Sequence, residues 1–327
     1  MIKQTLSILV LLVLMAGAVA AEEQAPACAD EDITCWMKLL ERDDPQAMRA
    51  AMQLGNLQSA EAVPALIEKL ASKDQYMATA ALHALIKIGK PAVLELVKAT
   101  KHKKASVRRY ATYALGRIGN GDAYDAVVSL IKDEDPTVRL QAAQALGVLK
   151  DQRALLPLFE LLRDQHVSVR VEAARSLGIF ADKRTVHQLI DYGICDLSPE
   201  VGRESARALV AIGEPAVTPL RQEYSSCASY ARKRILIALG NIAATATPET
   251  KKKVVDMCIA VVKRRNENME VRSVAAFTLG SLEAQDAVPA LQEVLAAANP
   301  EKPEEKKLAA ACQMALDKIN KRPNPSP

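Results

Sequence analysis

The chain has 327 residues, of which 43 are Lys or Arg and 39 are Asp or Glu, and half of its residues are apolar. This apolar content excludes a wholly disordered chain, and a formal charge of +4 is too small to predict nucleic-acid binding. With 3% aromatic residues and four His, the composition favours a helical, non-catalytic protein with no cofactor and no metal site.

The first twenty residues have the layout of a secretory signal peptide. One Lys precedes an apolar run from Leu6 to Met15, and Ala18-Val19-Ala20 fits a cleavage site. The run is shorter than the ~20 apolar residues that a membrane span needs, and no later segment reaches that length. We therefore predict a signal peptide over 1–20, no membrane span in the mature chain, and a periplasmic or secreted protein.

Residues 21–34 are expected to form an N-terminal arm that leads into the first helix. Cys28 and Cys35 flank the start of that helix, and Asp32 is its expected N-cap. Seven residues of separation through a turn can bring two Cys within disulfide range. Because six Cys in an exported chain favour disulfides, we predict a bond between Cys28 and Cys35.

From residue 35 to residue 320 the chain repeats with a period near 31. Each unit has an anchor Leu, preceded by Ala or a substitute and often followed by Gly. Small or apolar residues 8, 4, 3 and 1 positions before the anchor share one helix face, and a second apolar stripe precedes that helix. A helix pair this short must bury its face against the next pair, so we predict an all-α solenoid of about nine stacked pairs. Residues 321–327 are expected to be a disordered Pro-rich tail. The anchors are Leu54, Leu85, Leu115, Leu146, Leu177, Leu209, Leu239, Leu279 and Leu316.

The second helix of the best unit carries the motif Val-Arg-x-x-Ala-Ala-x-Ala-Leu-Gly-x-Leu, from Val138 to Leu149. With this motif the chain resembles HEAT-repeat proteins of the short HEAT-like class named after the phycobilisome lyases, over Cys35–Asn320. The resemblance implies a right-handed superhelix whose second helices line the concave surface, and it is nearly silent on activity. Units eight and nine depart from the period at Arg264–Met269 and Asn299–Glu305, and these loops are where individual function is expected.

An Arg recurs seven residues before the anchor, close to the direction of the packed side. One interpretation is a ladder that faces a ligand. The other pairs each Arg with loop acids such as Asp135, Asp164 and Glu267, or with the carbonyls that end a neighbouring helix. We favour this structural role, because a guanidinium there cannot reach the open face. The five residues are Arg108, Arg139, Arg170, Arg232 and Arg272.

Positions 6, 5 and 2 before the anchor and 2 after it point away from the core. Basic residues are frequent there, with Glu172 and Glu204 as counterweights. A merely solvated face is one explanation, and a groove that binds an acidic protein segment is the other. Nucleic acid is the weaker partner, because stacking aromatics are few. The predicted partner-binding residues are Arg109, Tyr110, Tyr113, Arg117, Arg175, Arg203, Arg207, Lys233 and Arg234.

No motif identifies catalytic chemistry. Helical-repeat hydroxylases that resemble this fold bind two irons through His-Glu pairs, but none of the four His here is followed by Glu. The lyase relatives suggest chromophore attachment, an intracellular chemistry against which the export signal argues. We predict an exported, non-catalytic scaffold that binds a protein partner through its concave face. A lyase-like or other enzyme is the alternative.

Four further Cys fall within the repeats. Cys195 and Cys227 lie 32 residues apart, near the ends of two successive first helices. A bridge between them is possible only where the loops lean together, because repeat spacing near ~10 Å exceeds the ~7 Å limit between Cα atoms. Cys258 and Cys312 occupy packed positions and are expected to be inert, unpaired thiols.

Overall fold

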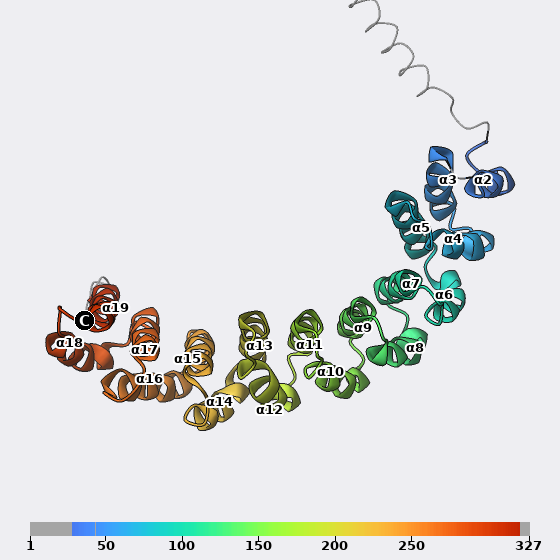
Figure 1. Ribbon diagram of the computed structural model, residues 1–327. Coiled ribbons are helices and arrows are strands. Elements are labelled where there is room, and N and C mark those ends of the chain that lie inside the picture. The colour runs from blue at the N-terminus through green and yellow to red at the C-terminus, as the bar shows by residue number, and fades with distance from the viewer. Residues whose placement is uncertain (1–27, 43, 321–327) are drawn as a thin grey trace, which may run out of the picture. The chain divides into compact units, whose positions relative to one another are not determined.

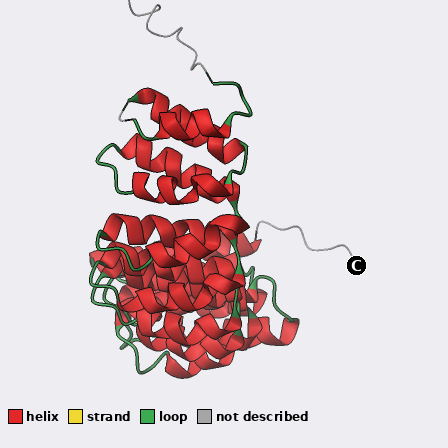
Figure 2. Cartoon of the chain, turned by 90° about the vertical axis from the view of Figure 1, so that its right-hand side faces the viewer, coloured by secondary structure: helices red, strands yellow, loops and turns green. Residues whose placement is uncertain are grey.

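The computed structural model of the protein describes residues 28–42 and 44–320. Within these ranges the chain is helical and contains no strand (Figure 2). The predicted signal peptide, residues 21–27 of the predicted arm, and the predicted tail over 321–327 lie outside the described residues. The eighteen α-helices of the described part form nine consecutive pairs, so the predicted all-α solenoid is confirmed.

The chain divides into two compact units, Met1–Ile118 and Gly119–Pro327, hereafter unit 1 and unit 2. The sequence predicted one continuous solenoid instead. The division falls at Gly119-Asn120-Gly121, three residues that favour turns over helix. In every pair the first helix comes before the second helix in the chain. Unit 1 holds α2 Ile33–Leu40 and α3 Pro45–Asn56, α4 Val63–Lys69 and α5 Gln75–Ile88, and α6 Val93–Ala99 and α7 Ala105–Ile118.

Unit 2 holds the remaining six pairs, whose second helices lie in one row on the inner side of an arc (Figure 1). In the sixth pair of the chain, the first helix α12 continues into a π-helical turn, η7 Leu189–Ile194. The pairs are α8 Tyr124–Ser129 and α9 Pro136–Leu149, α10 Leu155–Leu161 and α11 Val167–Phe180, α12 Val186–Gln188 and α13 Pro199–Ile212, α14 Val217–Glu223 and α15 Ser229–Ala243, α16 Pro248–Lys263 and α17 Met269–Ser281, and α18 Val288–Ala297 and α19 Pro303–Asn320.

Short polar side chains start many of the helices. Asp32 accepts a hydrogen bond from the N–H of Cys35, so α2 begins at Ile33, two residues before the predicted start of the repeats. Asp135 caps α9 by accepting from the N–H of Thr137 at 2.7 Å, and Asn268 caps α17 in the same way. These caps satisfy backbone donors that the first turn leaves without partners. They therefore fix where each capped helix begins.

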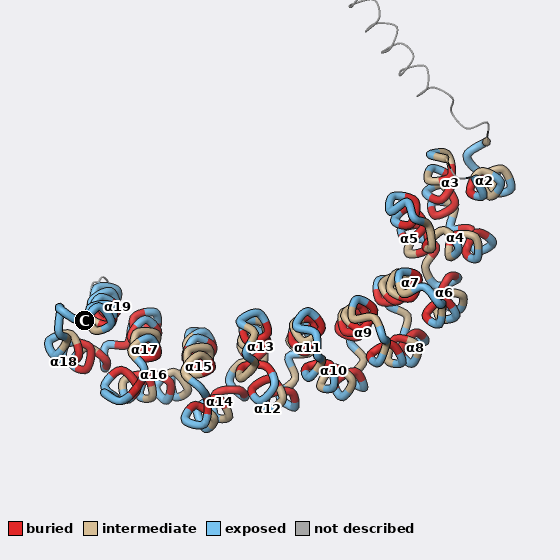
Figure 3. The backbone as a smooth tube through the Cα atoms, in the orientation of Figure 1, coloured by how far each residue is buried: buried red, intermediate tan, exposed pale blue. Residues whose placement is uncertain are grey.

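The hydrophobic core is built around the anchor Leu residues. All nine anchor Leu side chains are buried, and buried residues line the contacts between successive helices (Figure 3). The Gly after the anchor permits close approach: a β-carbon at Gly147 would overlap the side chain of Ser176 on the next second helix. The Ser176 hydroxyl uses this proximity to donate a hydrogen bond to the carbonyl of Ala143 at 2.9 Å. Small residues thus let neighbouring pairs share one continuous core.

The eighth and ninth helix pairs are longer than the others, and much of their extra length lies in helices. α16 has 16 residues, whereas the preceding first helix α14 has seven. α19 has 18 residues, the longest helix of the described chain. No helix within residues 28–42 or 44–320 combines the length and the apolar character that a membrane span requires.

Candidate functional site

The second helices of unit 2 are α9, α11, α13, α15, α17 and α19, and they lie in one row (Figure 1). The side of this row that points away from the packed anchors is the open face of unit 2. The position two residues before the anchor lies on this face in every pair. Its polarity changes along the unit. The fourth, fifth and sixth pairs carry Gln144, Arg175 and Arg207, whereas the seventh, eighth and ninth carry Ile237, Phe277 and Met314.

These last three side chains, the apolar stripe, are exposed to solvent. The exposed fractions are 49% for Ile237, 45% for Phe277 and 57% for Met314. The anchor Leu two residues further along each helix is buried, so a loosely packed core does not explain the exposure. The residues predicted from the sequence at this position were Tyr113, Arg175 and Arg207, and the stripe was missed. The signal was present as three apolar residues at one repeat position.

A groove of about 620 Å³ lies between α17 and α19 and contains two members of the stripe. Phe277, Met314 and Val274 provide its apolar lining. Lys233 and Lys307 stand at its margin together with Glu270 and Glu304, and Lys233 forms an ion pair with Glu270. Apolar walls with a few charged groups at the rim are typical of sites that accept part of a ligand.

The Arg residues on the open face of α11 and α13 are paired with carboxylates. Arg175 donates to Glu172 at 2.7 Å and lies 3.7 Å from Glu204, which also pairs with Arg207. Arg203 lies 3.2 Å from Glu200 on its own helix. Burial raises the pKa of Glu172, against the opposing effect of Arg175. This part of the face is an alternating acid–base network, and the groove for an acidic protein segment stays a prediction.

Arg234, one of the predicted partner-binding residues, contacts the preceding repeat. Its guanidinium is half-buried and donates to the carbonyls of Ile194 at 2.7 Å, Asp196 at 2.6 Å and Ser198 at 3.2 Å. It also stacks 5.0 Å from the ring of Tyr230. Burial lowers the pKa of this guanidinium. The side chain thus reaches into the preceding repeat, where it donates to the carbonyl that ends the π-helical turn and to two carbonyls of the loop that follows it.

Four predicted binding residues belong to α7 in unit 1. Arg109 stacks on the ring of Tyr110, with 4.6 Å between its Cζ atom and the ring centroid. Tyr113 is half-buried and Arg117 is exposed. The other five predicted residues, from Arg175 to Arg234, lie in unit 2. A single groove that contains all nine stays a prediction.

The recurring Arg seven residues before the anchor makes the contacts expected of a structural residue. Arg139 donates to Asp164 through two nitrogens, at 2.7 and 3.0 Å, and to the carbonyl of Asp133 at 2.8 Å. Arg170 repeats this arrangement with Asp196 one repeat later. The remaining contacts run from Arg108 to the carbonyls of His102 and Lys103, from Arg232 to Glu267, and from Arg272 to the carbonyl of Val262.

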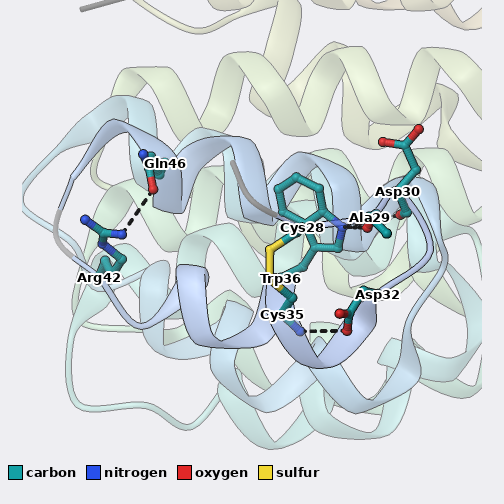
Figure 4. The surroundings of a disulfide bond; sticks show 8 residues. All are labelled: Cys28, Ala29, Asp30, Asp32, Cys35, Trp36, Arg42 and Gln46. Atoms are coloured by element: carbon teal, nitrogen blue, oxygen red, sulfur yellow. Dashed lines mark hydrogen bonds between the residues drawn. A yellow bond between two sulfur atoms is a disulfide. The ribbon is translucent and has the colours of Figure 1, made fainter. Parts of the chain in front are cut away.

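Cys28 and Cys35 form a disulfide in the structure, with their Cα atoms 5.6 Å apart (Figure 4). Cys195 and Cys227 are not bonded, and their sulfur atoms lie 3.1 Å apart, so the bridge considered for them is absent. The loops do lean together enough for contact, although not to the bond length of ~2.05 Å. Cys258 and Cys312 are buried free thiols, and burial raises the pKa of Cys258 to about 12. Within the described ranges no group of His, Cys, Asp and Glu gathers in a way that could hold a metal ion.

Nine stacked helix pairs with buried Leu anchors define an α-solenoid repeat protein. A family model for HEAT repeats matches residues 36–100, 95–169 and 155–240, and the PBS lyase HEAT-like repeat matches residues 271–297. Because these HEAT matches span well over half of the sequence, the chain belongs to the HEAT-repeat family. None of the curated proteins matches it in sequence.

The solved structures that are similar to the chain include these three. Importin beta has a TM-score of 0.62 at 15% identity, with a match that covers 88% of this chain and 44% of importin beta. This likeness shows the solenoid fold. Human deoxyhypusine hydroxylase in complex with glycerol has a TM-score of 0.34 at 22% identity, over 82% of this chain and 99% of the hydroxylase. The complex of CpcE and CpcF of phycocyanin lyase from a Nostoc species has a TM-score of 0.43 at 24% identity, over 47% of this chain and all of that chain.

The prediction that the chain is not an enzyme is contradicted. Residues 271–297 match the PBS lyase HEAT-like repeat, which takes its name from lyases. The prediction relied on the absence of short sequence motifs for catalysis. A repeat scaffold can assemble a site from residues far apart in sequence, and such a site leaves no local motif.

Proposed function

We propose that the chain binds a protein partner along the open face of unit 2, with the apolar stripe as the centre of the interface. The observation that carries this proposal is the exposure of Ile237, Phe277 and Met314 at one position of three successive repeats. Exposed apolar side chains that recur in register mark interaction surfaces more often than isolated ones do. The groove between α17 and α19 would accept one apolar side chain of the partner.

The partner segment carries apolar side chains for the stripe and acidic side chains for the adjoining Arg network. Arg175, Arg203 and Arg207 keep 52%, 60% and 72% of their side-chain surface exposed. Exposed ion pairs contribute little stability, so these guanidinium groups can exchange an internal carboxylate for one on the partner. The charged network therefore orients the partner, and the apolar stripe supplies most of the affinity.

Export belongs to the same proposal. The signal-peptide pattern of residues 1–20 supports a periplasmic or secreted protein, and so does the Cys28–Cys35 disulfide, because such bonds persist in oxidising compartments. The first residue of the protein isolated from the exported fraction, determined by mass spectrometry, tests this part. A chain that begins near Ala21 is expected, and an intact Met1 would overturn it.

Site-specific photo-crosslinking tests the interface. A photoreactive amino acid replaces Phe277 in one variant and Met314 in another. Matched controls carry it at Leu94 and Leu156, which are exposed apolar residues on first helices. Irradiation in the exported fraction is expected to give one discrete protein adduct from the stripe positions only. Equal adducts from all four positions, or none from the stripe, would overturn the proposal.

A repeat-containing enzyme is the second candidate function, favoured by the PBS lyase HEAT-like match at residues 271–297. That segment contains Phe277 and therefore one wall of the α17–α19 groove. The purified chain is incubated with the low-mass fraction of the cell, and mass spectrometry follows the compounds over time against heat-inactivated protein. Time-dependent loss of one compound that Phe277→Ser abolishes would support this candidate. Identical profiles with active and inactivated protein would reject it.

A further inference from the structure

Two thiols from successive repeats meet at the boundary between the sixth and seventh helix pairs. Cys195 ends the π-helical turn η7, and Cys227 lies in the turn between α14 and α15. Their sulfur atoms are 3.1 Å apart, although the two residues are separated by 32 positions in sequence. A disulfide needs a separation of ~2.05 Å, so an approach of about 1 Å would join them.

The backbone around Cys195 is held by the repeat that supplies Cys227. The Tyr230 hydroxyl on α15 donates to the carbonyl of Cys195 at 3.0 Å. Arg234, one turn further along α15, donates to the carbonyls on both sides, those of Ile194 and Asp196. Three hydrogen bonds therefore hold the segment that contains Cys195 against α15, the helix that follows Cys227. The contact between the two sulfur atoms is a product of this arrangement.

The π-helical turn explains why the thiols meet only here. The interval between the anchors Leu177 and Leu209 is 32 residues, whereas the preceding interval is 31 residues and the following one is 30. The first helix of this pair takes the π form over Leu189–Ile194. A π turn accommodates an added residue and rotates the residues that follow it. Cys195 is thereby turned toward the next repeat.

The two thiols differ in access to solvent. Cys195 is partly exposed, whereas Cys227 keeps 9% of its surface exposed. An oxidant in solution can therefore reach Cys195 first, and Cys227 stands directly behind it. This is the geometry of an attacking thiol with a resolving thiol.

We propose that Cys195 and Cys227 are a redox modification site, at which a disulfide-containing oxidant converts the thiol pair into a bond between the sixth and seventh helix pairs. Cys195 loses its proton to solvent, and its thiolate attacks one sulfur of the oxidant R–S–S–R. This forms a mixed disulfide and releases one R–S⁻. Cys227 then loses its proton, its thiolate attacks the Cys195 sulfur, and the second R–S⁻ leaves. One disulfide forms in the protein while the oxidant is reduced to two thiols.

The charges around the pair set its reactivity. Burial, the hydrogen bond with Cys227 and the nearby carboxylates Asp191 and Glu223 raise the pKa of Cys195 to about 12. From α15, the Tyr230 hydroxyl lies at the carbonyl of Cys195, and the cationic Arg234 interacts electrostatically with the Cys195 thiol. At neutral pH only a small fraction of Cys195 is thiolate, so oxidation is slow and accelerates about tenfold for each pH unit between pH 7 and pH 8.5. The site responds to sustained oxidising conditions.

Peptide mapping after controlled oxidation tests the proposal. The full chain is reduced, treated with oxidised glutathione, quenched with an alkylating reagent and digested. A crosslinked peptide that contains Cys195 and Cys227 is expected, while Cys258 and Cys312 are alkylated only after unfolding. Hydrogen exchange at amides of η7 is expected to slow at least tenfold in the oxidised protein, because the bond restrains local opening.

A matched variant separates the two steps. In Cys227→Ser the resolving thiol is absent, so Cys195 is expected to stop as the mixed disulfide with glutathione. Circular dichroism checks that the variant keeps its helices. The proposal is overturned if both Cys of the parent remain alkylatable after oxidation. It is also overturned if the parent stops at the same mixed disulfide as the variant.

Discussion

The guanidinium of Arg234 occupies the space that a side chain at position 202 would need. A β-carbon on Gly202, in α13, would overlap the Nε, Cζ and Nη1 atoms of Arg234, which extends from α15. The missing side chain lets the guanidinium pass beneath α13 to reach three carbonyls at the end of the π-helical turn. A glycine in one repeat thus makes room for a hydrogen-bonding residue from the next.

Gly202→Ala is expected to destabilise unit 2 by about 1–3 kcal/mol, because it displaces the guanidinium that donates to the carbonyls of Ile194 and Asp196. In an exposed helix the same change would stabilise by up to ~1 kcal/mol, so the sign distinguishes the two situations. Gly121→Ala is the control, because no atom lies within 4 Å of its β-carbon position. Urea unfolding followed by circular dichroism measures both. Equal stability of the two variants would contradict the role of Gly202.

Arg139→Ala is expected to cost about 3–5 kcal/mol, because it leaves the buried carboxylate of Asp164 without its cation. The side chains of this ion pair keep only 7% and 8% of their surface exposed. Arg153 pairs with Asp151 at the same distance of 2.7 Å, but its side chain is 62% exposed. Arg153→Ala, the control, is therefore expected to leave the stability close to that of the parent. Similar losses in the two variants would show that burial of the pair is not decisive.

The same pair predicts a dependence of stability on pH. Burial opposes ionisation of Asp164, but the hydrogen bonds from Arg139 and the N–H of His166 prevail and lower its pKa below the ordinary 3.8. A carboxyl whose pKa is lowered by folding stabilises the protein above its unfolded pKa, and this contribution disappears as the pH falls through the folded pKa. The stability difference between the parent and Asp164→Asn should be constant above about pH 5 and shrink below pH 4. Urea unfolding between pH 3 and pH 7 measures it, and a constant difference would contradict the assignment.

The N-terminal disulfide can be followed through the single Trp of the chain. Trp36 is buried, and its Nε1–H donates to the carbonyl of Ala29 at 3.0 Å, inside the loop that Cys28–Cys35 closes (Figure 4). Cleavage of the bond is expected to favour opening of this loop by about 2 kcal/mol. The tryptophan emission should then shift to longer wavelength on reduction and in Cys28→Ser, but not in Cys195→Ser. An unchanged emission in Cys28→Ser would contradict the prediction.

The fold was predictable because one residue type repeats at one spacing. Every anchor from Leu54 to Leu316 is buried as expected, since a Leu at a fixed place in a 31-residue period has to face the neighbouring pair. The role of Arg139 could be anticipated for the same reason. The division after Ile118 was not predicted, because the period continues through it without a change of register.

The open face was harder to predict, because charge in a sequence does not show which partner a charge has. Arg175 and Arg207 pair with Glu172 and Glu204, and Arg234 turns into the preceding repeat. A search for basic residues selected all three. The apolar stripe was overlooked because Phe277 and its neighbours resemble ordinary core residues until their exposure is known.

The most direct test is a quantitative pull-down from the exported fraction with three baits. These are the parent chain, the stripe variant Ile237→Ser/Phe277→Ser/Met314→Ser, and the control Leu94→Ser/Leu156→Ser, whose exposed apolar residues lie on first helices. The proposed function predicts one protein retained in stoichiometric amount by the parent and the control, and recovered at least tenfold less by the stripe variant. Equal recovery of that protein by all three baits, with circular dichroism showing all three folded, would contradict it.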